Sequence, residues 1–142
     1  MVFLQLWRQC PIHAIRLNGG GQSPEPLWIS KNFGPIEPSL LFYRGLLYAL
    51  MDNGILMCLE GKTGAETYRE RLGGNWNSTP IASDGRIYLS NNEGKTLVVG
   101  AGPQFELLAT NDLGERITAS PAISGNDLIY RTDSHLYLIR NK

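Results

Sequence analysis

Short runs of alternating apolar and polar residues recur along the chain, and each run is four to seven residues long. Residues 86–90 and 136–139 are clear examples. Runs of this length and period are typical of β-strands, whereas helical repeats need longer segments with a period of about 3.6 residues. Glycine and asparagine lie in the turns between runs, at residues 52–54, 83–85 and 92–94, where they tolerate the positive φ of tight hairpins. The pattern predicts an all-β chain.

The strand pattern itself repeats, with a period close to 40 residues. The segment 45–48, Gly-Leu-Leu-Tyr, returns as 85–88, Gly-Arg-Ile-Tyr, and the tyrosine returns once more as Tyr130. Four further registers keep this spacing: Ser39, Thr79 and Ser120; Leu56, Leu97 and Leu136; Trp28, Tyr68 and Leu108; Gly34, Gly73 and Gly114. A unit of this length with four short strands predicts the blade of a β-propeller.

Applied to the whole chain, the repeat predicts a partial β-propeller of about three four-stranded blades, in an open or incomplete ring. Residues 1–35 are the outer strands of a preceding blade, 36–75 and 76–116 are full blades, and 117–142 form an incomplete final blade. A closed propeller needs at least four blades, because closure removes exposed strand edges. We therefore expect further blades from a longer chain or from other copies. In the second case, the first seven residues would supply the outer strand of a partner's final blade.

Composition excludes several classes of protein. The 142 residues are 42% apolar and 18% charged, which is typical of a globular domain. Thirteen basic residues balance thirteen acidic ones, so an electrostatic footprint for nucleic acid is missing. No apolar run approaches the roughly 20 residues of a membrane span, and the first nine residues do not read as a signal peptide. Cys10 and Cys58 lack metal-ligand spacing, and we expect both to be small apolar side chains.

One eleven-residue segment resembles the tryptophan-docking motif of the PQQ-like, or quinoprotein-like, propeller repeat. That motif begins with alanine, has aspartate third, carries a Thr-Gly pair and ends with tryptophan. Here Cys58 stands for the alanine, Glu60 for the aspartate and Tyr68 for the tryptophan, while Thr63 and Gly64 match closely. Residues 14–28 look like a longer copy, and 98–108 look like a degenerate one. The resemblance covers nearly the whole chain.

The resemblance implies a fold, and it implies that the aromatic end of the motif packs between neighbouring blades. It does not imply the quinone cofactor, because many similar propellers bind none, including those that look like the outer-membrane assembly lipoprotein. The quinone-dependent alcohol dehydrogenases carry a vicinal cysteine disulfide, a stacking tryptophan and a Glu/Asn/Asp calcium set. This sequence has no adjacent cysteines, so we predict no cofactor. The resemblance also implies a periplasmic or secreted location.

Candidate catalytic and metal residues do not form a recognisable set. Two Gly-Lys-Thr triplets, at 61–63 and 94–96, lack the glycine that a phosphate-binding loop requires five residues earlier. His13 and His135 are the only histidines, and neither has a second ligand at zinc-binding spacing. His135 follows Asp133 and Ser134, but neighbours in sequence do not form a catalytic triad. The sequence therefore predicts no catalytic, cofactor-binding or metal residues.

The link between the two full blades is the candidate interaction site. It carries Asn75, Trp76 and Asn77, and such links open on a propeller face near the central channel. A tryptophan among amide side chains can stack on a ligand or anchor a partner. The alternative is that Trp76 packs between the blades.

These observations favour a non-catalytic propeller segment that acts as a protein-interaction or scaffold module. The alternative is a fragment of a PQQ-dependent oxidoreductase whose active-site residues lie in other blades. A hydrolase or lyase that uses the propeller face is a third hypothesis. The predicted partners are the remaining blades of a longer chain, other copies of the chain, or other proteins.

Overall fold

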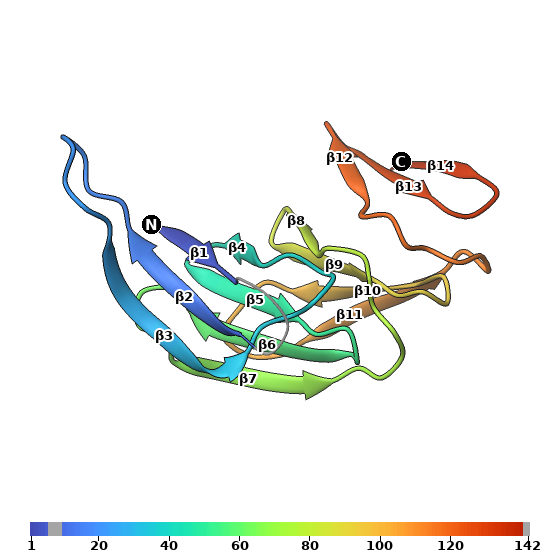
Figure 1. The fold of residues 1–142 in the computed structure, drawn as a ribbon. Helices are drawn as coiled ribbons and strands as arrows, with labels where there is room; N and C mark the ends of the chain where they lie inside the picture. Colours follow the sequence, from blue (N-terminus) through green and yellow to red (C-terminus); the bar gives the residue numbers. More distant parts are fainter. Residues whose placement is uncertain (6–9, 141–142) are drawn as a thin grey trace.

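The chain folds into four antiparallel sheets that follow one another along the sequence (Figure 1). The computed structural model describes residues 1–5 and 10–140, except for the side chain of Phe33. Within these residues all regular structure is β-strand, and no helix long and apolar enough to cross a membrane occurs among them. The sheets stay separate and none closes into a barrel. The predicted all-β class is confirmed.

The second and third sheets have four strands each, and strands that are consecutive in sequence are neighbours in space. The second sheet contains β4 (Leu41–Tyr43), β5 (Leu46–Leu50), β6 (Ile55–Glu60) and β7 (Glu66–Arg71). The third sheet contains β8 (Ile81–Ser83), β9 (Arg86–Ser90), β10 (Lys95–Gly100) and β11 (Leu107–Asp112).

The first and fourth sheets have three strands each in the described residues. The first contains β1 (Val2–Leu4), β2 (Pro11–Arg16) and β3 (Glu25–Phe33), and the fourth contains β12 (Ala122–Ser124), β13 (Asp127–Arg131) and β14 (Leu136–Arg140). β1 pairs with β2 of its own sheet. The expectation that the N-terminal strand completes a partner's final blade is therefore wrong for residues 2–4, while residues 6 and 7 lie outside the described part.

Strand register shows which positions of the repeat are equivalent. Tyr48 and Tyr88 each lie opposite the first residue of the innermost strand in their sheets. In the fourth sheet this position belongs to Ile129 and not to Tyr130. A shift of one residue sends a side chain to the other face of a sheet. The sequence alignment of Tyr130 with the two earlier tyrosines is therefore wrong by one residue.

The second sheet is buried on both faces, because neighbouring sheets pack against each of them. Alternate residues of β5 and β6 point to opposite sides. One set packs toward the first sheet and comprises Leu47, Ala49, Met57 and Leu59, together with Ile12 of β2. The other set packs toward the third sheet and comprises Tyr48, Leu50, Leu56 and Cys58, together with Ile87, Leu89 and Val99.

Trp28 on β3 fastens the first sheet to the second. Its indole Nε1 donates a hydrogen bond to the carbonyl oxygen of Gly61 at 2.9 Å. Its ring lies against Gly64, so a Cβ added there would be 2.6 Å from Trp28 Cδ2. The turn is shaped by Thr63, whose hydroxyl donates to Glu60 Oε2 at 2.6 Å. All five of these residues lie in the motif copies 14–28 and 58–68.

The next motif copy makes a different contact between the second and third sheets. The ring of Tyr68 meets that of Phe105 edge-on, with 5.9 Å between the centroids. The Cys58 thiol is fully buried and points at the Gly102 carbonyl, 3.9 Å away. Burial raises the pKa of the Cys58 thiol and of the Tyr68 hydroxyl. Since the thiolate is the reactive form, Cys58 is an unreactive packing residue here.

Gly64→Ala tests the Trp28 contact. Gly64 has φ +72° and meets the indole, whereas Gly73 has φ +69° and open space around its Cα. Both substitutions strain the backbone, but only Gly64→Ala also overpacks the interface, which costs about 1–3 kcal/mol. We expect Gly64→Ala to lower the free energy of unfolding by that amount more than Gly73→Ala, measured by urea denaturation. Equal losses would show that Trp28 does not dock tightly.

Candidate functional site

Trp76 lies inside the protein and not on its surface. Its side chain is 1% exposed and belongs to the cluster between the second and third sheets, with Leu50 and Leu56. Its Nε1 donates to the carbonyl oxygen of Gly73 at 2.5 Å. The ring is therefore not available to stack on a ligand or anchor a partner. That hypothesis is wrong in this structure, and the packing alternative describes Trp76.

The two asparagines of the link are exposed, and both hold the turn between β9 and β10. The backbone carbonyl of Asn75 accepts from the Asn92 amide at 2.9 Å. The side-chain oxygen of Asn77 accepts from Asn92 Nδ2 at 2.7 Å. These bonds fix the link to the third sheet, and the partner role of Asn75 and Asn77 remains a prediction.

A second set of side-chain contacts holds the turn between β13 and β14, and the sequence analysis did not predict it. His135 Nδ1 lies 2.6 Å from Glu115 Oε1, and the Thr132 hydroxyl donates to Glu115 Oε2, also at 2.6 Å. Glu115 lies on the link into the fourth sheet, while the other two flank the β13–β14 turn. The Thr132 hydroxyl, and then His135, lower the pKa of the Glu115 carboxyl. Twenty residues separate Glu115 from His135, so no local motif could have revealed this pairing.

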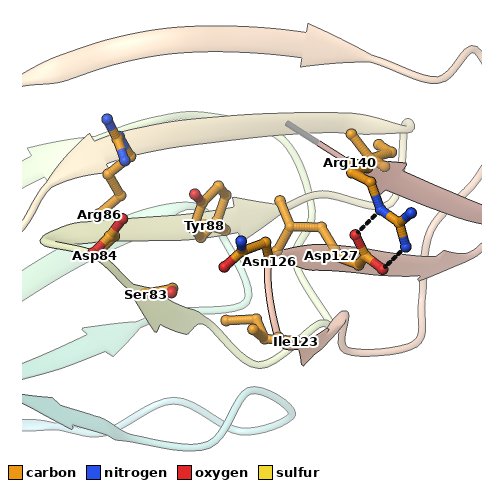
Figure 2. Close-up of a pocket in the computed structure, with 11 residues that line it drawn as sticks. Ser83, Asp84, Arg86, Tyr88, Ile123, Asn126, Asp127 and Arg140 are labelled. Atoms are coloured by element: carbon orange, nitrogen blue, oxygen red, sulfur yellow. Dashed lines mark hydrogen bonds and ion pairs between the residues drawn. The ribbon is translucent and has the colours of Figure 1, made fainter. Parts of the chain in front are cut away.

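An opening with charged groups of both signs lies between the third and fourth sheets (Figure 2). It is a cavity of about 610 Å³, lined by β8, β9 and the turn that joins them, and by β12, β13 and β14. In Figure 2, Asp84 and Arg86 lie at one end of it and Asp127 and Arg140 at the other, with Tyr88 between. The sequence analysis placed Arg86 and Tyr88 in the strand repeat and Asp84 in a turn, but it did not propose any of these residues as a site.

The far end of the cavity is held by an ion pair across two strands. Asp127 and Arg140 lie opposite each other on β13 and β14. The guanidinium Nε and Nη2 donate to the two carboxylate oxygens at 2.7 and 2.6 Å. This hydrogen bonding lowers the pKa of the Asp127 carboxyl. A two-point contact of this kind fixes both side chains, which gives the cavity one wall of defined shape.

The remaining candidate residues are dispersed. His13 is on β2 and His135 on the turn before β14, in the first and fourth sheets. The Gly-Lys-Thr triplet at 61–63 is in the turn before β7, and the triplet at 94–96 opens β10. Among the residues that the structure describes, no three His, Cys, Asp or Glu side chains come together in a way that could hold a metal ion.

Comparison with solved structures relates this fold to known propellers. BamB from Moraxella catarrhalis superposes with a TM-score of 0.76 at 10% sequence identity, over 94% of this chain and 39% of that one. A europium-containing methanol dehydrogenase gives 0.60 at 12% identity, over 72% of this chain and 21% of that one. The quinohemoprotein alcohol dehydrogenase ADHIIG from Pseudomonas putida HK5 gives 0.58 at 13% identity, over 66% and 16%.

These likenesses show the fold: the chain is a partial β-propeller, similar to the propellers of BamB and of the two dehydrogenases. The resemblance seen in the docking motif is thereby confirmed. No protein-family model matches the sequence, and a search of curated proteins finds no match. The chain spans about two fifths of the BamB chain, so it corresponds to part of a propeller of that size.

The Glu115 contacts predict a pH-dependent attachment of the fourth sheet. Because the carboxyl pKa is lower in the folded chain, its contribution is complete above the unfolded pKa and is lost as the pH falls through the folded one. We expect Glu115→Gln to lower the urea midpoint at pH 7, and the difference from wild type to shrink as the pH falls below the carboxyl pKa of the unfolded chain, about 4.3. Glu93→Gln, which changes a carboxylate on the β9–β10 turn, is the control. A difference that persists unchanged in acid would contradict the prediction.

Proposed function

We propose that the chain is a non-catalytic propeller segment that acts as a protein-interaction or scaffold module. One observation carries the proposal. β6 and β10 each have strands on both sides, whereas β14, the equivalent strand of the fourth sheet, is paired only with β13 in the described residues. Leu136 and Leu138 of β14 are 75% and 60% exposed. An open strand edge with exposed leucines favours association with another protein surface.

The partners that fit this edge are further blades. In the proposed division, residues 1–35, 36–75, 76–116 and 117–142 are successive blade units, of which the first and last lack a strand. The second sheet is stabilised by apolar contacts with both of its neighbours. A sheet of a longer chain or of a second copy would make the same kind of apolar contact with the outer face of the fourth sheet. The family resemblance supports a periplasmic location for such a protein.

A fragment of a PQQ-dependent oxidoreductase is the second candidate, and the likeness to a methanol dehydrogenase and to a quinohemoprotein alcohol dehydrogenase supports it. The residues present do not fit the cofactor. Cys10 and Cys58 are both free cysteines, and Cys58 is buried in an apolar cluster. No metal-binding group of His, Cys, Asp or Glu occurs in the described part of the chain. Under this hypothesis, residues that bind the quinone would come from other blades.

Leu138→Lys tests the interaction proposal. We expect the wild-type chain to self-associate through its open edge, so that the mass from light scattering exceeds 15.8 kDa and rises with concentration. A lysine on the edge strand blocks pairing, so the variant stays monomeric. Leu17→Lys changes a leucine of similar exposure in a loop, and it should behave like the wild type. A wild-type chain that remains monomeric at its highest soluble concentration would contradict the proposal.

Quinone titration separates the two candidates. We expect that adding PQQ with calcium to the chain produces no saturable change in the absorbance of the quinone, because the chain lacks the family's binding set. Saturable binding at one quinone per chain would reject the scaffold proposal in favour of the oxidoreductase fragment. Heat-unfolded protein is the control for nonspecific adsorption.

A further inference from the structure

The cavity between the third and fourth sheets arises from a change in the repeat. At its rim, Tyr43 ends β4 and Ser83 ends β8, at equivalent register positions. The Tyr43 hydroxyl accepts a hydrogen bond from the Gly85 amide at 3.0 Å, and its ring covers the interface between the second and third sheets. Serine is too short to make such a contact. The space that a tyrosine ring fills in one interface is therefore open in the next.

The replacement of larger side chains by serine or threonine continues deeper between the sheets. Leu50 and Leu56 are opposite each other in the second sheet and are fully buried. Their equivalents in the third sheet are Ser90 and Thr96, whose hydroxyls are 2.9 Å apart. The third sheet thus presents hydroxyl groups toward the fourth sheet where the second presents leucines toward the third. These two hydroxyls are buried, are hydrogen-bond partners of each other, and lie outside the lining of the cavity.

The groups around the opening limit what can bind there. Two carboxylates, Asp84 and Asp127, balance two guanidinium groups, Arg86 and Arg140. An anion would meet the carboxylates and a cation would meet the guanidinium groups, so the lining favours a neutral ligand. Carboxylates only accept hydrogen bonds and guanidinium groups only donate them. A ligand that satisfies both must carry groups that donate and accept.

Two further side chains of the cavity lining can contact a ligand. Asn126, at the start of the fourth sheet's hairpin, can donate and accept within one amide. Tyr88 projects into the cavity between the two charged ends and offers a ring face for stacking (Figure 2). The volume of about 610 Å³ lies within the range of small-molecule sites. A ligand that carries hydroxyl groups on a compact ring with apolar C–H faces could bond to these polar side chains and stack on the tyrosine ring.

We propose that the cavity between the third and fourth sheets binds a saccharide. The hydroxyl groups of the sugar bridge the carboxylates and guanidinium groups at its two ends, and the C–H face of the ring stacks on Tyr88. Asn126 contacts a hydroxyl pair near the middle. This site does not depend on the open edge of β14 and would bind its ligand in a monomeric chain.

The test is calorimetric titration of the full 142-residue chain with maltose, cellobiose and N,N′-diacetylchitobiose. We expect saturable binding of at least one disaccharide, with a dissociation constant in the millimolar range or tighter. Succinate and spermidine are titrated as an anion and a cation. Failure of all three disaccharides to bind, or tighter binding of succinate or spermidine, would overturn the proposal.

Two variants locate the binding. Ser83→Tyr restores the ring that fills the preceding interface, and Asn126→Ala removes an exposed amide with little risk to folding. We expect each to weaken saccharide binding by about tenfold or more. Ser124→Tyr is the matched control, because it places a tyrosine at the equivalent end of β12, outside the cavity lining. Equal affinity of wild type and both cavity variants, with unchanged circular dichroism, would show that the sugar binds elsewhere.

Discussion

Burial of the second sheet between the first and the third is the constraint on which this structure depends. Strands β5 and β6 carry apolar side chains on both faces, which a single layer cannot hide from water. The first sheet covers one face and the third covers the other. Direct polar contacts, such as that of the Trp28 indole with Gly61, then fix how neighbouring sheets meet. The fold is therefore a stack of mutually dependent units.

The repeat is not uniform, and its variation distinguishes the interfaces. Between the second and third sheets, Tyr43, Leu50 and Leu56 make an apolar contact. Between the third and fourth, Ser83 lines a cavity at the position where Tyr43 packs in the preceding interface. Ser90 and Thr96 replace the two leucines and bond to each other, and the contacts of Glu115 hold the opposite end of this interface together. The same register positions therefore carry different side chains in the packed interface and in the open one.

The fold was predictable because a 40-residue period and the alternation within each strand are local properties. The candidate site was much less predictable. The sequence left two interpretations of Trp76 open, since a tryptophan between two amides fits either a face or a core. Its burial depends on Leu50 and Leu56 from the preceding sheet. Tyr130 was aligned by residue type, but its register is set by pairing with β12, which leaves Ile129 at the equivalent position. A shift of one residue along a strand places a side chain on the opposite face of the sheet.

The sequence by itself determined the strands, the turns and the blade-like repeat, because strand propensity, glycine in tight turns and a period of two act over a few residues. Only the tertiary structure decided which side chains meet between sheets. The pairing of Glu115 with His135 and the cavity beside Tyr88 both join residues from different sheets. Such contacts depend on the angle and spacing of whole sheets, which no local pattern encodes.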